Sequence, residues 1–292
     1  MKELLRKLRK YEIQIRKAIT TQMQGDFHSV FKGSGLEYED VRSYQYGDDV
    51  RSIDWNVSAK GHGTFVKTYR EEKEQSVFLI LDVSASQEIG VPGHQKLDVC
   101  REICGILALS AVKQSSQVGI FCFSEGKELY LPPDQGIQHA FRIIKSIFNL
   151  KPKSIRTNLA GGIKSVLSII KRRSVLILVS DFIDTDYQRE LKTLAKRHDL
   201  VVVQLYDKRD KGLPELGIVP LFDKEQQRMI WVNTSSPEFQ AAYEGTYAQN
   251  RKELEKVCRK NNANYLAIDT SEDYVPQLIE LFKHRKLARK SG

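Results

Sequence analysis

Three hard oxygen donors follow a short apolar segment in the first third of this chain. Residues 77–81 are all apolar, and Asp82, Ser84 and Ser86 come directly after them at alternate positions. Such an apolar run predicts a strand that is buried on both faces of a parallel sheet. Ligands of these sheets bind just beyond the carboxyl ends of the strands, and Mg²⁺ prefers hard oxygen ligands. We therefore expect a divalent-cation site after this strand.

Two further oxygen donors extend the candidate site. Thr157 lies in a polar loop before a predicted helix, and Asp181 follows the segment 175–180, which reads as another buried strand. If the two strands are neighbours, Asp82 and Asp181 project from adjacent carboxyl ends and Thr157 lies beside them. Each donor alone has a commoner explanation, because serine, threonine and aspartate often cap helices or close turns. The ordered combination favours a site for Mg²⁺ or another divalent cation, such as Mn²⁺ or Ca²⁺.

The charge of this donor set predicts what the site does. Two carboxylates formally cancel the charge of Mg²⁺, while the hydroxyl groups add dipoles but no charge. An octahedral Mg²⁺ ion also keeps water ligands on its open side. Because a weakly screened cation that faces solvent attracts an external carboxylate, we expect the site to recognise an acidic side chain of a protein partner.

The elements that must position these donors alternate between strands and helices. Strands are predicted at residues 76–81, 118–123, 174–180, 200–206 and 265–269. Helices are predicted near residues 96–115, 136–148, 158–172, 187–198, 237–261 and 272–285. Residues 128–131 read as an antiparallel edge strand, residues 217–232 as a hairpin, and Asp184 and Asp186 as caps of the next helix. The alternation predicts an α/β fold with a doubly wound, mostly parallel sheet.

The residues before this sheet have a different character. Residues 2–20 carry apolar side chains at helical spacing, which predicts an amphipathic helix docked on the body of the protein. Residues 64–70 alternate and read as a half-exposed strand. We therefore expect an N-terminal helix with a small β-rich extension over 1–73, an α/β domain over 74–286 and a basic tail over 287–292.

A second polar cluster lies in the β-rich extension. It contains Asp48, Asp49, Arg51, Asp54 and Trp55. We expect these charged groups to form ion pairs and hydrogen bonds that pin the segment to the sheet, with the tryptophan buried beside them. The alternative is that the cluster forms a partner-binding surface.

The charge of the chain is concentrated at its two ends. The net charge is +9; residues 1–20 carry seven Lys/Arg against two Glu, and residues 283–292 carry five Lys/Arg and no acid. Basic ends can attract nucleic acid or an anionic membrane surface, so an adaptor of that kind is one alternative. Nucleic acid is disfavoured because no basic patch is interleaved with aromatic residues. Peripheral membrane contact stays open.

Location and redox state follow from what the sequence lacks. No apolar run approaches the ~18 residues that span a bilayer, and no signal peptide is visible, so a cytoplasmic protein is expected. The four cysteines have no zinc-site spacing, and we expect them to be free and buried.

A metal-dependent phosphatase or other hydrolase is the enzymatic alternative. Phosphoaspartate chemistry of the D-x-D type needs a second acid where Ser84 stands. The sequence has no G-x-S-x-G nucleophile elbow and no histidine that is tied to a serine, so a general base is missing. We therefore expect a protein that is not an enzyme.

The candidate donors also resemble a known site. The metal-ion-dependent adhesion site of von Willebrand factor type A domains is similar to the ordered set Asp82-x-Ser84-x-Ser86, Thr157 and Asp181. One departure is Gln87, because the position after the second serine is often methionine or another apolar residue. We expect this change to leave the ligands intact and to make the rim of the site more polar.

Three upstream segments add a second resemblance. Residues 47–55 (GDDVRSIDW) resemble the signature of the domain-of-unknown-function 58 family, and residues 31–37 and 66–72 fit the same family. The resemblance implies a Rossmann-like sheet flanked by helices. It also implies a partnership with a MoxR-type AAA+ ATPase in protein assembly or in the maturation of metal centres.

Overall fold

A computed structural model describes most of the chain. The described residues are 2–21, 36–60, 63–71, 76–88, 90–91, 94–113, 115–207, 215–223 and 228–281. The predicted basic tail at 287–292 lies outside them, as do parts of the segments that resemble the family signature at 31–37 and 66–72.

A six-stranded sheet with the strand order β12-β9-β8-β3-β6-β7 forms the centre of the molecule. Its strands are β3 (Val77–Asp82), β6 (Val118–Phe123), β7 (Lys127–Asp134), β8 (Val175–Ser180), β9 (Asp199–Tyr206) and β12 (Asn264–Asp269). All neighbouring pairs run parallel except β6 and β7, which are antiparallel. The predicted doubly wound, mostly parallel α/β fold is therefore confirmed, together with its antiparallel edge.

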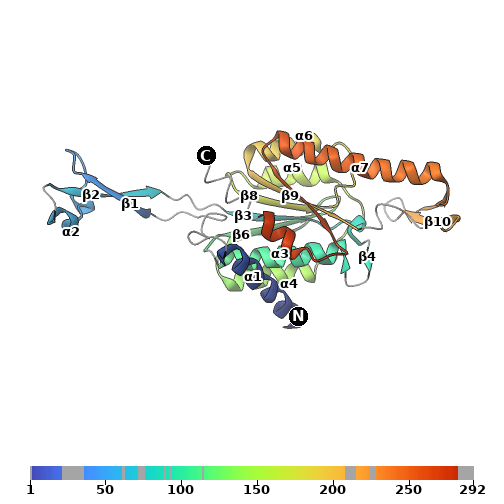
Figure 1. Cartoon of the computed structure of the whole chain (residues 1–292), viewed down its shortest axis with the longest axis horizontal. Coiled ribbons are helices and arrows are strands. Elements are labelled where there is room, and N and C mark those ends of the chain that lie inside the picture. Colours follow the sequence, from blue (N-terminus) through green and yellow to red (C-terminus); the bar gives the residue numbers. More distant parts are fainter. Residues whose placement is uncertain are drawn as a thin grey trace.

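Helices cover both faces of this sheet, as Figure 1 shows. They are α1 (Lys2–Thr21), α3 (Lys96–Val112) and α4 (Ile137–Phe148) on one face, and α5 (Leu159–Ile169), α6 (Gln188–Arg197) and α7 (Pro237–Lys260) on the other. Leu79 and Leu81 of β3 join the core under α3, whereas Phe78 and Ile80 join the core under α5 and α6. Because successive strand residues point to opposite faces, an uninterrupted apolar strand supplies both cores.

The helical predictions are confirmed with small shifts at the ends. The helix that we predicted at 272–285 is observed over residues 275–281; residues 272–274 are not helical, and residues 282–285 lie outside the described ones. The predicted cap of α7 is present, because Ser236 Oγ accepts a hydrogen bond from Phe239 N, with Pro237 at the first helical position. All four cysteines are buried and free, as expected.

The N-terminal helix α1 packs on α3. Leu8 is fully buried in the core between α1, α3 and α4. Glu12 and Lys113 form an ion pair, and Lys7 Nζ lies 2.6 Å from Glu102 Oε1. Leu8 therefore faces the protein, as the spacing of the apolar residues in this helix predicts.

Three two-stranded hairpins accompany the central sheet. They are β1 (Leu36–Ser43) with β2 (Phe65–Glu71), β4 (Gly90–Val91) with β5 (His94–Gln95), and β10 (Ile218–Asp223) with β11 (Arg228–Asn233). The predicted hairpin at 217–232 is thus present. The β1–β2 hairpin extends away from the sheet in Figure 1.

The domain boundary that we placed between residues 73 and 74 stays a prediction. The helix α1, which we assigned to the N-terminal part, packs against α3 of the α/β domain. None of the helices in the described ranges combines the length and the apolar character that crossing a bilayer requires.

Candidate functional site

The strand order places Asp82 and Asp181 at the point where the sheet reverses its direction of growth. β3 has β6 on one side and β8 on the other. α3, which follows β3, covers one face of the sheet, and α6, which follows β8, covers the opposite face. The two connections leave the carboxyl ends of β3 and β8 in opposite directions, and ligands of doubly wound sheets bind in the crevice at such a switch point. The candidate site requires these two strands to be neighbours, and β3 and β8 do pair in parallel.

Asp82 lies at the centre of a hydrogen-bond network and is completely buried. Its Oδ1 accepts hydrogen bonds from Ser84 N at 2.9 Å and Ser84 Oγ at 2.6 Å. Its Oδ2 accepts a hydrogen bond from Ser180 Oγ at 2.7 Å. The loop after β3 therefore turns back on the last residue of the strand, and the neighbouring strand contributes the third donor.

The surroundings of Asp82 favour its protonated form. Burial, followed by the nearby Asp181 carboxylate, raises the pKa of Asp82 to about 7. The hydrogen bonds from Ser84 and Ser180 lower this pKa, but they do not outweigh the first two effects. Desolvation and like charge both destabilise a buried carboxylate. The carboxyl group of Asp82 consequently changes charge near neutral pH, and a nearby cation would stabilise its ionised form.

A lysine that the sequence analysis did not include lies against Asp181. Lys96 is the first residue of α3, and its Nζ lies 3.0 Å from Asp181 Oδ2. The side chains of Lys96 and Asp181 are 0 % and 1 % exposed, so water does not screen the pair. Asp181 Oδ1 also accepts a hydrogen bond from Ile183 N at 3.3 Å. One of the two predicted acidic ligands is therefore already paired with a cation.

Gln87 does not make the rim of the site more polar, which corrects our prediction. Its side chain is completely buried, and its Nε2 donates a hydrogen bond of 3.5 Å to Asp82 Oδ2. Its Oε1 is buried and has no hydrogen-bond partner among the described residues. The short 3₁₀ helix η3 (Ala85–Glu88) turns the side chain inward, beneath the loop. An orphaned amide oxygen next to a buried carboxylate is a hard acceptor without a donor.

The two hydroxyl-bearing loops lie side by side. Ser84 Oγ and Ser86 Oγ are 3.1 Å apart, and the backbone N–H of Ala85 donates a hydrogen bond of 3.0 Å to Ile155 O. This bond brings the loop that carries Thr157 against the loop after β3. Thr157 is partly buried and directly precedes Asn158, which caps α5 by accepting a hydrogen bond from Gly161 N.

Asp184 caps a different helix from the one we predicted. Its Oδ2 accepts a hydrogen bond of 2.8 Å from Leu159 N, at the start of α5. The N-cap residue of α6 is Tyr187, whose side chain makes no capping hydrogen bond. The carboxylate therefore ties the loop after β8 to the loop after Thr157. Asp184 lies just before α6 in the sequence, so we expected it to cap that helix. Its contact with the start of α5, 25 residues earlier, forms only in the folded protein.

The donors fit a hard cation in chemical type, but their charge differs from our prediction. The predicted site contains hydroxyl and carboxylate oxygens, and the orphaned Gln87 Oε1 adds another hard oxygen. Within the described ranges, no group of three or more His, Cys, Asp or Glu side chains is arranged to hold a metal ion. The ammonium of Lys96 lowers the formal charge of Asp82 and Asp181 together from two negative charges to one. A metal-binding site here would depend on hydroxyl groups.

Sequence reasoning missed Ser180 and Lys96 for different reasons. Ser180 is the only polar residue of β8 and directly precedes Asp181, so its place at the carboxyl end of a strand was a usable signal. Lys96 is the first residue of α3, and a lysine at such a position ordinarily reaches solvent along its stem. Its burial against a residue 85 positions later had no local signal.

The second polar cluster is a local network of the β1–β2 hairpin. Asp48 receives two hydrogen bonds from the Arg42 guanidinium, at 2.6 and 2.7 Å, and they lower the pKa of Asp48. Asp49 caps the 3₁₀ helix η2 (Val50–Ser52), and Asp54 caps α2 (Trp55–Ser58). The acids thus stabilise turns of the hairpin, and the observed ion pair uses Arg42 where we had predicted Arg51.

The prediction that Trp55 is buried is wrong. Its side chain is 69 % exposed, because it is the first residue of the four-residue helix α2 on the outside of the hairpin. Ile53, which forms a bridge with Val66, occupies the buried position that we assigned to the tryptophan. The partner-binding alternative for this cluster stays a hypothesis.

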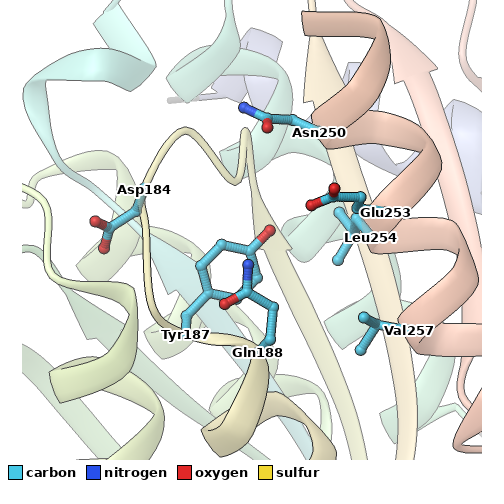
Figure 2. A pocket seen from close by; sticks show the side chains of 7 residues that line it. All are labelled: Asp184, Tyr187, Gln188, Asn250, Glu253, Leu254 and Val257. Carbon is cyan, nitrogen blue, oxygen red and sulfur yellow. The ribbon is translucent and has the colours of Figure 1, made fainter. Parts of the chain in front are cut away.

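A small pocket lies between the loop after β8 and α7. Figure 2 shows its lining, which comes from the loop after β8, from the start of α6 and from α7. The lining residues are Asp184, Tyr187, Gln188, Asn250, Glu253, Leu254 and Val257. Burial raises the pKa of the Tyr187 phenol above its usual range, so this group stays protonated. The pocket contains no group of the predicted cation site.

With this geometry in view, comparisons with known proteins identify the family. The model of the family described as "Protein of unknown function DUF58" matches residues 40–253. The chain belongs to this family. Uncharacterized proteins of Mycobacterium bovis and Mycobacterium tuberculosis are each 25 % identical to this DUF58 chain over 288 residues, which cover 98 % of it and 90 % of the relatives. The DUF58 resemblance of the segment at 47–55 is thereby confirmed.

Solved structures with a similar arrangement share little sequence with this DUF58 protein. BatB from Bacteroides thetaiotaomicron is 14 % identical with a TM-score of 0.45, and the match covers 74 % of this chain and 99 % of that one. The von Willebrand factor domain of the type V pili tip protein Mfa5 from Porphyromonas gingivalis is 12 % identical with a TM-score of 0.38, covering 73 % and 95 %.

Proposed function

We propose that this protein is a non-enzymatic interaction module that binds an acidic side chain of a partner protein through a divalent cation. The proposed cation is Mg²⁺, and Mn²⁺ or Ca²⁺ are the alternatives. The residues that would hold it are Asp82, Ser84, Ser86, Thr157 and Asp181. When bound, the cation would supply a positive charge beside the partly exposed Ser86 and Thr157, where it could accept a carboxylate from the partner.

One observation carries this proposal: the carboxyl ends of β3 and β8 meet at the switch point of the sheet, with the Ser84–Ser86 and Thr157 loops beside them. The orphaned Gln87 Oε1 adds support, because a buried acceptor without a donor is stabilised by a cation. The arrangement combines ionisable oxygens with hydroxyl groups, which is the donor chemistry that Mg²⁺ prefers.

Two histidines whose side chains the structure describes lie away from the candidate site, which supports binding over catalysis. His139 Nε2 is 2.8 Å from Val118 O, at the beginning of β6, and His198 directly precedes β9. Both side chains are therefore at the amino-terminal edge of the sheet, opposite Asp82. A general base must come within hydrogen-bond reach of the reacting group, and neither of these two described histidines does so.

A metal titration tests the cation. We expect Mg²⁺ to stabilise the wild-type protein by about 2.7 kcal/mol at a hundredfold excess over its dissociation constant. Ser86→Ala removes a partly exposed hydroxyl of the proposed site, and it should remove most of this gain. Ser168→Ala, which changes an exposed serine of α5, is the matched control and should keep the gain. An unchanged unfolding free energy of the wild type at millimolar Mg²⁺ contradicts the proposal.

The proposed partner is a MoxR-type AAA+ ATPase. The wild type should capture this ATPase in a pull-down with Mg²⁺ and lose it when Mg²⁺ is chelated. Ser86→Ala should reduce the capture, while Ser168→Ala should not. Capture that is indifferent to both the chelator and Ser86→Ala would assign the contact to another surface.

A further inference from the structure

We propose that the Lys96 ammonium is a built-in cation of this site and competes with a divalent cation for the Asp181 carboxylate. This inference rests on the cation site of the proposed function and names the residue that sets its affinity. The ion pair is 3.0 Å long, and both side chains are almost completely shielded from water. Solvent and salt screen such a buried pair much less than an exposed one, so its attraction is stronger.

The competition follows from the charges that surround Asp181. Asp82 and Asp181 are close enough for the charge of one to raise the pKa of the other, so they form a pair of like charges. Lys96 neutralises one member of this pair in the metal-free protein. A divalent cation that approaches both carboxylates also approaches the ammonium, and this repulsion weakens metal binding.

The position of Lys96 makes it a fixed partner. It begins α3, whose first turn is held by reciprocal hydrogen bonds between Gln95 and Asp98, and the next residue, Leu97, is buried in the core. Gln95 Nε2 also donates a hydrogen bond of 2.8 Å to Glu88 O at the end of η3. The helix start is thus tied to the loop that carries Ser84 and Ser86.

The position of Gln87 Oε1 indicates which end of the cluster would stabilise a divalent cation most. This buried oxygen lies on the Asp82 side of the cluster and has no donor among the described residues. The two ends of the cluster therefore differ: the Asp181 end is satisfied by Lys96, and the Asp82 end contains an unsatisfied hard oxygen. A cation that binds at the Asp82 end can take Asp181 as a ligand only if the ion pair between Lys96 and Asp181 breaks.

Removal of the lysine charge tests the competition. Lys96→Gln keeps a side-chain donor for Asp181 but no charge, and Lys96→Met is a second uncharged variant in case the glutamine does not fold. Calorimetric titration of Mg²⁺ and Mn²⁺ into chelator-treated full-length protein should give a dissociation constant at least ~10-fold lower for the uncharged variants, because a buried unit charge near a divalent ion changes its binding by more than this.

Two controls make the measurement specific. Lys164→Gln removes an exposed lysine that lies 3.5 Å from Glu190, and it should leave the dissociation constant unchanged. In the double variant Lys96→Met with Asp181→Asn, the gain in affinity should disappear, because the carboxylate that the lysine releases is also absent. A thermal melt in chelator should show a lower midpoint for Lys96→Gln than for the wild type, and added Mg²⁺ should reverse this loss.

The outcomes separate this inference from the proposed function. If the wild type binds Mg²⁺ and the uncharged variants bind no more tightly, the inference is overturned while the cation site stands. If only the uncharged variants bind, the inference stands and the cation dependence of the wild type fails. If no folded variant binds either metal, both are overturned.

Discussion

The Ser180 hydroxyl donates a hydrogen bond of 2.7 Å to Asp82 Oδ2 and thereby links the carboxyl ends of β8 and β3. Both side chains are completely buried. Ser180 Oγ also accepts a hydrogen bond of 3.0 Å from Phe182 N, which holds the loop after β8. The serine therefore supports the candidate site from the neighbouring strand.

Ser180→Ala should lower the free energy of unfolding by about 1.5–3 kcal/mol, because a hydrogen bond to a buried carboxylate is lost. Urea denaturation in chelator measures the change. The matched control is Ser168→Ala, whose exposed hydroxyl bonds to Ser165 O; it should change stability by less than about 0.5 kcal/mol. Equal effects of the two substitutions would show that the Asp82–Ser180 bond contributes nothing.

The raised pKa of Asp82 predicts how stability changes with pH. The pKa is about 7 in the folded protein against a usual value of 3.8, so the folded state binds the proton more tightly than the unfolded state. The stabilisation that this group gives is therefore fully present below about pH 4 and is lost as the pH rises through 7.

Asp82→Asn should remove this pH dependence. Between pH 4 and 7, the wild type should lose stability relative to the variant, with a limiting slope of about 1.4 kcal/mol per pH unit. The measurement is the difference in unfolding free energy between the two proteins in urea, at several pH values and in the presence of chelator. Parallel pH profiles would contradict the assignment.

The docking of α1 predicts a large effect of Leu8. Its side chain is completely buried, and its Cδ1 lies 2.9 Å from the position that a Cβ would take at Gly105 of α3. Leu8→Ala should cost about 2–5 kcal/mol, because it leaves a cavity between α1 and α3. Ile13→Ala, at a side chain that is 37 % exposed in the same helix, should cost much less. Thermal or urea unfolding of both variants measures the difference.

The close approach of α5 to the sheet predicts that Gly162 cannot be enlarged. A Cβ at this position would lie 2.3 Å from Cδ2 of the Phe123 ring, which is completely buried. Gly162→Ala should therefore destabilise the protein by about 1–3 kcal/mol, although alanine favours helices. Gly126→Ala, where a Cβ meets no atom of the described structure within 4 Å, should be nearly neutral. A stabilised Gly162→Ala protein would contradict this packing.

The sequence alone determined the architecture of the sheet. Uninterrupted apolar runs such as those of β3 and β8 can be stable only where both faces are covered, so their composition specifies the buried parallel strands. The alternation with helices then restricts the topology to a doubly wound sheet. The sequence left open whether β3 and β8 are neighbours, and the observed strand order places Asp82 and Asp181 at adjacent carboxyl ends.

Only the tertiary structure decided the electrostatics of the site. Lys96 meets Asp181 across 85 residues of sequence, and a lysine at the start of a helix reads as exposed until the strand that buries it is placed. The environments of Trp55 and Gln87 also depend on the fold. We expected Trp55 to be buried and Gln87 to lie at the rim of the site, but Trp55 is exposed and Gln87 is buried. The identity of the oxygen donors is a property of the chain, whereas their charge balance depends on which distant side chains the fold packs against them.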